Sequence, residues 1–445
     1  MTSLANQLDN LVWGPPLLIL LVGTGLYYSI RLGFLQIKKL GFALTLILRK
    51  SDGKGDISSF AALATALAAT VGTGNMVGVA TAIKTGGPGA LFWMWVAAFL
   101  GMATKYAEGV LAIKYRTLDN KGQVAGGPMY YITQGMGKKW RPLATCFAFF
   151  GTLVALFGIG TFAQVNAITS AVNHSFGLSP KWLSILLALL VALIIFGGIQ
   201  SISKVAEKLV PFMAITYILA TLMVICSHYT QLLPMLGLVF KSAFTPLAAM
   251  GGFGGALVKE AIQKGIARGV FSNEAGLGSA PIAAAAAKTK QPVEQGLVSM
   301  TGTFIDTIII CTLTGLAILV SGQWTSSLEG APLTQAAFAS IFGHLGQIAF
   351  MISLILFAFT TILGWSYYGE RCFAFLAGSA HLNYFRLLFV TMVALGGYLK
   401  LDFVWILADI VNGLMAIPNL IALLALAPVV FQETQAYFHS HNSDS

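Results

Sequence analysis

Long apolar stretches recur along the whole chain and are separated by short polar stretches. A membrane hydrocarbon core about 30 Å thick needs roughly 20 mostly apolar residues for each helical crossing. The sequence supplies eleven such stretches, at 15–31, 59–83, 89–114, 143–172, 182–200, 208–228, 269–288, 297–321, 347–376, 384–400 and 403–431. The pattern predicts an all-helical integral membrane protein with about eleven transmembrane helices.

Two of these stretches are interrupted by small and polar residues. The first interruption runs from Ala68 to Gly78 and the second from Phe271 to Pro281. Glycine costs about 1 kcal/mol per helical position relative to alanine, and unpaired backbone in lipid costs several kcal/mol per group. We therefore expect both helices to open where they face protein or a hydrated cavity. Opened helix ends offer amides to an anion and carbonyls to a cation.

Glycines in a membrane helix also permit close packing, and Gly74 and Gly78 have the spacing of small-xxx-small contacts. Packing alone does not explain why Thr, Asn, Ser and Glu fill the same two windows. Neither window contains Lys or Arg, which suits a ligand without net charge. We therefore favour a binding role at the middle of the membrane.

The two interruptions divide the chain into related units. We expect an extra N-terminal helix with a basic loop (1–50), a first five-helix unit (51–228), an extracellular amphipathic loop (229–268), a second five-helix unit (269–431) and a cytoplasmic tail (432–445). Because five is odd, the second unit crosses the membrane in the opposite sense. This is the arrangement of inverted repeats around a central site.

Charge is sparse and unevenly placed. Only 9% of the 445 residues are charged, against about 25% in soluble proteins. The net charge of +10 comes from basic clusters in alternate loops, such as Lys38, Lys39 and Lys54, and not from one basic face. This pattern argues against nucleic acid and predicts an outside N-terminus and a cytoplasmic C-terminus. Asp9 precedes the first span and Arg31 follows it, the reverse of a cleavable signal peptide.

Other chemistry is weakly represented. The four cysteines are isolated in or beside apolar spans, the six histidines are scattered, and no zinc-binding spacing occurs. No nucleophile with a base, paired catalytic carboxylates or phosphate-binding loop can be assembled, so we do not expect an enzyme or a primary pump. In the loop 229–268, Glu260, Lys264 and Arg268 recur at helical spacing. We expect an interfacial helix there, used as a lid, for packing or for recognition.

Five carboxylates lie inside spans, where charge is costly and usually functional or paired. They are Glu108, Glu274, Asp306, Glu370 and Asp409. Glu274 falls in the second interruption and could organise the backbone, attract cations or carry a proton. Asp306 has no local basic partner. It could couple a cation, orient the residues that bind the ligand, or make structural hydrogen bonds. The pairs Glu370 with Arg371 and Glu108 with Lys105 suggest anchors or gates.

At four motifs the chain resembles the alanine or glycine:cation symporter family, also called amino acid carrier proteins. They are Val71-Gly72-Thr73-Gly74-Asn75, Gly86-Gly87-Pro88-Gly89-Ala90, Gly126-Gly127-Pro128-Met129-Tyr130-Tyr131 and Phe271-Ser272-Asn273-Glu274-Ala275-Gly276-Leu277-Gly278. The resemblance implies a LeuT-like 5+5 inverted repeat with one extra N-terminal helix. It also implies import of alanine or glycine with sodium, without an organic cofactor, across a bacterial cell (inner) membrane.

The resemblance also implies site residues. The expected substrate-binding residues are Thr70, Gly72, Thr73, Gly74, Asn75, Gln164, Phe271, Ser272, Asn273, Gly276 and Trp365, with Trp365 closing the pocket. The expected sodium ligands are the carbonyls of Ala68 and Val71 and the hydroxyls of Thr360 and Thr361. The two threonines could instead bond back to their own helix. Glu274 and Asp306 remain candidates for coupling.

Three rival interpretations stay open at this point. The same fold could couple to protons instead of sodium, or prefer glutamine or serine. An ion channel fits less well, because no filter repeat is present and the two interruptions differ in sequence. In each case the partners are the bilayer and a small solute.

Overall fold

The apolar spans fold into helices because a backbone in lipid must satisfy its own hydrogen bonds. The computed structural model describes residues 7–8, 11–49, 53–245, 258–398 and 401–443. The first half of the chain forms α2 (Pro15–Arg31), α3 (Leu35–Lys38), α4 (Leu40–Ile47), α5 (Ser59–Thr70), the π-helix η1 (Gly74–Gly78), α6 (Val79–Gly86), α7 (Gly89–Lys114), α8 (Pro128–Tyr131), η2 (Ile132–Met136), η3 (Lys138–Trp140), α9 (Arg141–Phe157), α10 (Phe162–Phe176), α11 (Pro180–Ile195), α12 (Gly198–Ser227) and α13 (Tyr229–Phe244).

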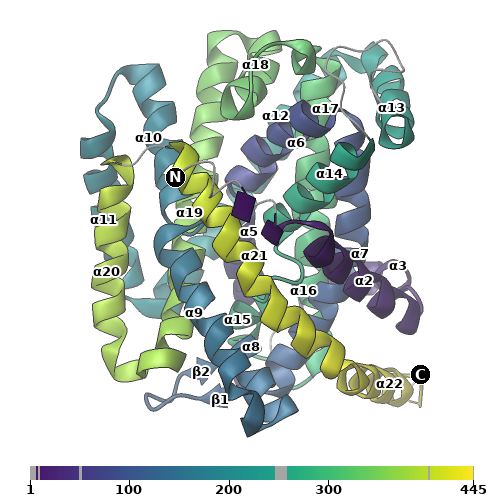
Figure 1. Ribbon diagram of the computed structural model, residues 1–445, viewed down its shortest axis with the longest axis vertical. Coiled ribbons are helices and arrows are strands. Elements are labelled where there is room, and N and C mark those ends of the chain that lie inside the picture. Colours follow the sequence, from purple (N-terminus) through teal and green to yellow (C-terminus); the bar gives the residue numbers. More distant parts are fainter. Residues whose placement is uncertain (1–6, 9–10, 50–52, 246–257, 399–400, 444–445) are drawn as a thin grey trace.

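The second half repeats the same kind of succession. It forms α14 (Val258–Asn273), α15 (Ala280–Ala285), α16 (Pro292–Thr303), the π-helix η5 (Phe304–Cys311), α17 (Thr312–Val320), η6 (Gln323–Thr325), α18 (Gly330–Phe342), α19 (His344–Ala377), η7 (Ser379–His381), α20 (Leu382–Leu395), η8 (Gly396–Tyr398), α21 (Leu401–Ala425) and α22 (Ala427–Ser443). The helices stand roughly side by side, with α13 and α18 at one end of the bundle (Figure 1).

The eleven expected spans can be matched to these helices. By length and apolar composition, six helical stretches of the described chain could each cross a membrane, or seven if the bent pair α5 and α6 is one span. The other four expected spans correspond to α2, α11, α20 and the pair α14 and α15. The expected span 143–172 is divided into α9 and α10. The expected span 403–431 is also divided, because α21 ends at Ala425 and residues 427–431 lie at the start of α22.

The predicted start of the seventh span was wrong. We expected it at 269, after an interfacial helix, but α14 is one helix that begins at Val258. Glu260, Lys264 and Arg268 therefore belong to the first half of the second broken helix, which packs along α6 and α7. Protein shields this half-helix, so its sequence can be more polar than that of a lipid-facing span. Part of the expected loop, 246–257, lies outside the described residues.

α7 occupies the middle of the bundle. It packs against α14 on one side and α16 on another, and most of its side chains are buried. The short polar motifs that follow it form a hairpin at the opposite end from α18. Here β1 (Thr117–Leu118) pairs antiparallel with β2 (Val124–Ala125), with Thr117 opposite Ala125. We call this end of the bundle the hairpin end and the other the α18 end (Figure 1).

Arg116 ties the hairpin end together. Its guanidinium donates to the carbonyls of Ala285, Ala287, Thr289 and Lys54, with the Lys54 and Thr289 contacts both 2.8 Å long. Three of these carbonyls belong to the end of α15 and the residues after it, and the fourth precedes α5, so one side chain contacts the outer ends of both broken helices.

We expect Arg116→Met to destabilise the protein by about 2 kcal/mol or more, because four carbonyls lose a charged donor. Thermal unfolding of the purified protein in detergent measures the loss. Lys121→Met, an exposed change in the same hairpin, is the matched control. Equal melting temperatures for the two variants would contradict the assignment.

Candidate functional site

The first interruption is a real break in the helix. α5 ends at Thr70, η1 begins at Gly74, and the two halves are bent by 52°. The backbone amide of Gly72 donates to Asn75 Oδ1 at 2.8 Å, and the backbone amide of Asn75 donates to the Gly72 carbonyl at 3.3 Å. In a continuous helix these amides would serve the carbonyls of Ala68 and Val71. The break therefore diverts the amides that would otherwise occupy the two carbonyls expected to bind sodium.

The second interruption is also a break. α14 ends at Asn273 and α15 begins at Ala280. Between them Glu274 adopts a left-handed conformation at φ 57°, and Gly276 and Gly278 both lie at φ 84°. A left-handed residue other than glycine costs about 1–2 kcal/mol. The structure thus confirms that both helices open where the sequence predicted.

The two breaks pack closely against each other, and we call the place where they meet the junction. A Cβ added to Gly74 would lie 3.2 Å from the Ser272 Cα and 3.5 Å from the Phe271 ring. A Cβ added to Gly78 would meet nothing within 4 Å. Glycine is therefore needed for close approach at position 74 but not at 78, so the small-xxx-small interpretation explains only one of the pair.

Side chains of α10 and α19 lie next to this junction. A Cβ on Gly72 would contact Thr361 Oγ1 on α19, and Gln164 Oε1 on α10 would be 3.6 Å from it. One turn further along α19, Trp365 donates its Nε1 proton to Glu274 Oε1 at 3.0 Å. The second break is therefore fastened to α19 by an expected pocket residue and an expected coupling residue.

Two of the expected substrate residues hold polar atoms without a partner. Gln164 and Thr73 are fully buried, and neither the Gln164 amide nitrogen, its oxygen nor Thr73 Oγ1 makes a hydrogen bond among the described residues. A buried polar group left unpaired costs about 1–3 kcal/mol, and such groups in native proteins need an explanation. A bound molecule with its own donors and acceptors would supply these missing bonds.

Asp306 connects the two breaks. It lies in the π-helix η5 and accepts from Asn75 Nδ2 at 2.7 Å, from Ser272 Oγ at 2.9 Å and from Thr307 Oγ1 at 2.7 Å. Asn75 belongs to the first break and Ser272 to the second. The structure thus gives Asp306 the structural hydrogen-bonding role, and its part in cation coupling stays a prediction.

The threonines expected to bind sodium are placed differently. Thr361 faces Gly72 in the first break, whereas Thr360 contacts Met213 on α12, with its Oγ1 3.5 Å from Sδ. Both hydroxyls donate to the Phe357 carbonyl, as in the alternative interpretation. Each still has lone pairs for a cation, and neutral oxygens suit a hard ion such as sodium. The two hydroxyls therefore keep the chemistry that a sodium ion needs, Thr361 lies against the first break, and the sodium site stays a prediction.

Three other expected residues make their contacts away from this junction. Thr70 donates to Ala66 O within its own helix, and Asn273 bonds Thr307 Oγ1 and the Ala275 amide. Gly276 is directed towards Leu21 and Leu420, away from the first break. These residues shape the breaks, and their contact with substrate stays a prediction.

Sequence reasoning missed a second polar network around the second break. Asn419 on α21 donates to Glu108 Oε1 at 2.7 Å and to the Gly276 carbonyl at 2.9 Å, and it accepts from Tyr131. Glu108 Oε1 also accepts from the Gly278 amide at 3.1 Å. Asn419 follows Pro418 inside an apolar run, which was the available signal.

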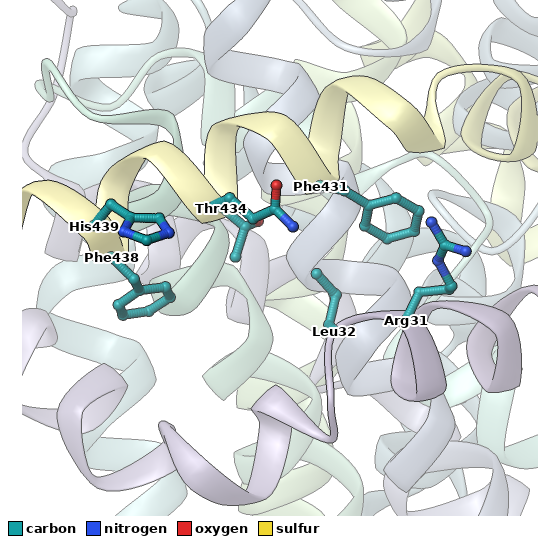
Figure 2. Close-up of a pocket in the computed structure, with 7 residues that line it drawn as sticks. Arg31, Leu32, Phe431, Thr434, Phe438 and His439 are labelled. Atoms are coloured by element: carbon teal, nitrogen blue, oxygen red, sulfur yellow. The ribbon is translucent and has the colours of Figure 1, made fainter.

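Cavities lie at both ends of the bundle. At the α18 end, a cavity of about 640 Å³ opens between α6, α10, α18 and α19 and includes Thr81, Asn166 and Ser170. Near the hairpin end, a shallower pocket lies between the end of α2 and α22, where Arg31 sits 5.1 Å from the centre of the Phe431 ring (Figure 2). None of the expected site residues lines either cavity, so neither is the candidate site itself.

Ion pairs join different helices towards both ends of the bundle. At the α18 end, Arg268 on α14 pairs with Asp409 on α21 at 3.0 Å. At the hairpin end, buried Arg371 pairs with Asp119 at 3.1 Å and with Glu370 at 2.8 Å, and Glu370 also pairs with Arg386. The sequence predicted an anchor or gate at Glu370 and Arg371, but it named no partner for Asp409. A gating role for either group stays a prediction.

Comparisons with known proteins agree with this architecture. The sodium:alanine symporter family model matches residues 1–445. The chain is 55% identical to an uncharacterised transporter of Haemophilus influenzae, covering 98% of this chain and 96% of that protein. It is 51% identical to the sodium/alanine symporter AgcS of Methanococcus maripaludis, covering 98% and 97%.

A solved structure shows the same fold. MhsT in complex with L-phenylalanine superposes with a TM-score of 0.56 at 13% identity, covering 86% of this chain and 98% of that one. At this identity the likeness concerns the fold alone. It confirms the expected LeuT-like arrangement of helices.

Proposed function

The chain belongs to the sodium:alanine symporter family, and from that premise we propose that it imports a small neutral amino acid, alanine first, together with sodium. The two broken helices provide one site for both, and the two repeats expose this site alternately to the two sides of the membrane. The protein itself is a multi-pass membrane transporter.

One observation carries the proposal: Thr73 in the first break and Gln164 beside Gly72 hold buried polar atoms that have no hydrogen-bond partner among the described residues. A zwitterionic amino acid offers a carboxylate and an ammonium group in a span of a few ångströms. Opened backbone and a neutral amide can bind both without a charged side chain. The first break also takes away the amides that would bond the carbonyls of Ala68 and Val71 in a continuous helix, and it lies against Thr361. These oxygens are the ones that we propose for sodium.

The ends of the bundle suggest the route. We assign the α18 end to the outside and the hairpin end to the cytoplasm, because the loops of the hairpin end carry the basic clusters. The cavity of about 640 Å³ then serves as the entry vestibule. The Arg268 and Asp409 pair would gate entry, and the Arg371 cluster would gate release.

The test is uptake by purified protein in liposomes. Labelled alanine outside should accumulate when sodium is higher outside than inside, and excess glycine, serine or glutamine added as competitor ranks the substrates. Neither ligand alone should cross efficiently, because each completes the binding site of the other.

The same assay separates the rival functions. Accumulation driven by a proton gradient without sodium would establish proton coupling, and stronger competition by glutamine or serine would change the substrate. Unsaturable flux would indicate a channel, and chemical change of the labelled substrate would indicate an enzyme. Uptake that ignores both gradients would refute coupled transport.

A further expected result concerns Gln164→Leu. Leucine fills similar space but has no polar atoms, so the variant loses the amide that we assign to the substrate. We expect the KM for alanine to rise about tenfold or more, while thermal stability stays equal or increases because two unpaired buried atoms are removed. Uptake kinetics and melting temperature measure the two effects.

The matched control for this change is Gln347→Leu. Gln347 is an exposed residue at the start of α19, away from the junction of the two breaks. It should leave KM unchanged. If the melting temperature of Gln164→Leu falls together with its uptake, Gln164 only supports the fold.

A further inference from the structure

A lysine lies buried inside the bundle next to both broken helices. Lys105, on α7, is 3% exposed. It lines a cavity of about 20 Å³ together with Thr70 of α5 and Asn273 of α14, which is room for about one water molecule. A lysine at this depth is costly unless other charges balance it.

The balancing charges are three buried carboxylates. Glu108 lies one helical turn from Lys105 on α7. Asn273, which lines the small cavity with Lys105, directly precedes Glu274 and donates to the hydroxyl of the residue after Asp306. The negative charges of all three carboxylates act on Lys105. Among the ion pairs of the described residues, none joins Lys105 directly to one of them. Lys105 is thus a shared counter-ion and not one half of a salt bridge.

Each carboxylate accepts hydrogen bonds from uncharged donors, and these donors belong to different elements. Asp306 holds Asn75 of the first break, and Glu274 accepts from Trp365 of α19 and from Ser279. Glu108 holds the Gly278 amide of the second break, and its Oε2 atom makes no hydrogen bond among the described residues. A change of charge at Lys105 would therefore alter the electrostatic environment of both breaks.

The charges of the cluster do not cancel. Three carboxylates and one ammonium leave an excess of two negative charges when all four groups are ionised. An unbalanced buried charge is unfavourable, so the cluster attracts a further cation. Lys105 repels the same cation, and a repulsion inside the protein is much stronger than in water.

We infer that Lys105 is a resident cation that sets the affinity for the transported sodium ion by neutralising part of this carboxylate cluster. It acts through the charge of the site and not by touching the ion, so it is a positioning residue. The inference rests on the proposed sodium-coupled transport.

The experiment is the sodium dependence of alanine uptake in proteoliposomes. Lys105→Met should lower the sodium concentration for half-maximal uptake about tenfold or more. Lys105→Arg, which keeps the charge, should stay close to the wild type. Lys114→Met removes an exposed lysine from the end of the same helix and should also change nothing.

A double variant separates charge from folding. Lys105→Met with Glu108→Gln removes one charge of each sign, and the new amide nitrogen can take the place of the unpartnered Oε2 atom. Its half-maximal sodium concentration should return close to that of the wild type, including where Lys105→Met alone does not accumulate. A double variant that also fails to accumulate, or that keeps the shift, would assign Lys105 a structural role and overturn the inference.

The remaining outcomes are equally decisive. An unchanged or raised half-maximal sodium concentration in Lys105→Met would overturn the inference while leaving the transport function intact. Wild-type uptake without sodium dependence would instead refute the proposed function itself.

Discussion

Asp306→Asn is expected to abolish nearly all coupled uptake, with a fall of about 100-fold or more in kcat/KM for alanine. The carboxylate now accepts from three donors, one from each break and one from Thr307. An amide in its place keeps one oxygen for Asn75 but presents N–H groups to the Ser272 and Thr307 hydroxyls, which lose the acceptor for their own protons. Asn75 fixes this orientation, because its own oxygen already accepts from the Gly72 backbone amide at 2.8 Å.

The size of this effect follows from the number of bonds disturbed. Each buried donor left unpaired costs about 1–3 kcal/mol, and 1.36 kcal/mol corresponds to a tenfold change in rate. Two disturbed donors therefore give about 100-fold. Initial rates of alanine uptake over a range of sodium concentrations measure it.

The control for this variant is Glu433→Gln. Glu433 pairs with Lys114 at the partly exposed hairpin end, and its side chain is 26% exposed. Its removal should leave uptake near the wild-type rate. Full sodium-driven uptake by Asp306→Asn would show that the carboxylate neither organises the breaks nor senses the ion.

The two breaks were the part of the site most readable in the sequence. Glycine and polar residues inside apolar runs are unfavourable in a lipid-facing helix, so their presence marks opened backbone. The structure opens both helices there, with Glu274 in a left-handed conformation. The family motifs cover the same residues, and the helical order followed from hydropathy.

Other features could not be read because they depend on contacts between distant residues. The start of α14 was hidden because this half-helix is shielded by α7 and carries Glu260, Lys264 and Arg268 on a partly polar surface. The bond between Trp365 and Glu274 joins positions 91 residues apart. Hydropathy reports the environment of a segment, but it does not report which polar side chains meet inside the bundle.

The same limit explains the sodium threonines. Thr360 and Thr361 are adjacent, so a helix directs their side chains about 100° apart. One then meets the first break and the other meets Met213. The sequence alone gave both an equal claim, and only the packing of α19 against α5 and α12 distinguishes them.

That packing makes Gly72→Ala the second large expected effect. The new methyl group would fall on Thr361 Oγ1, which is buried and held by its bond to the Phe357 carbonyl. Threonine is stiff in a helix, so α5 and α19 would have to separate, at a cost of about 1–3 kcal/mol. The separation would disturb the proposed sodium position and the nearby Gln164 amide together.

We therefore expect Gly72→Ala to lower alanine uptake at least about 30-fold and to raise the half-maximal sodium concentration, both measured in proteoliposomes. Gly78→Ala is the matched control, because it adds the same methyl group to the same broken helix where nothing lies within 4 Å. It should transport like the wild type. Since alanine favours the helix at both positions, equal losses in the two variants would trace the effect to backbone stiffness, and the contact between Gly72 and Thr361 would no longer explain sodium coupling.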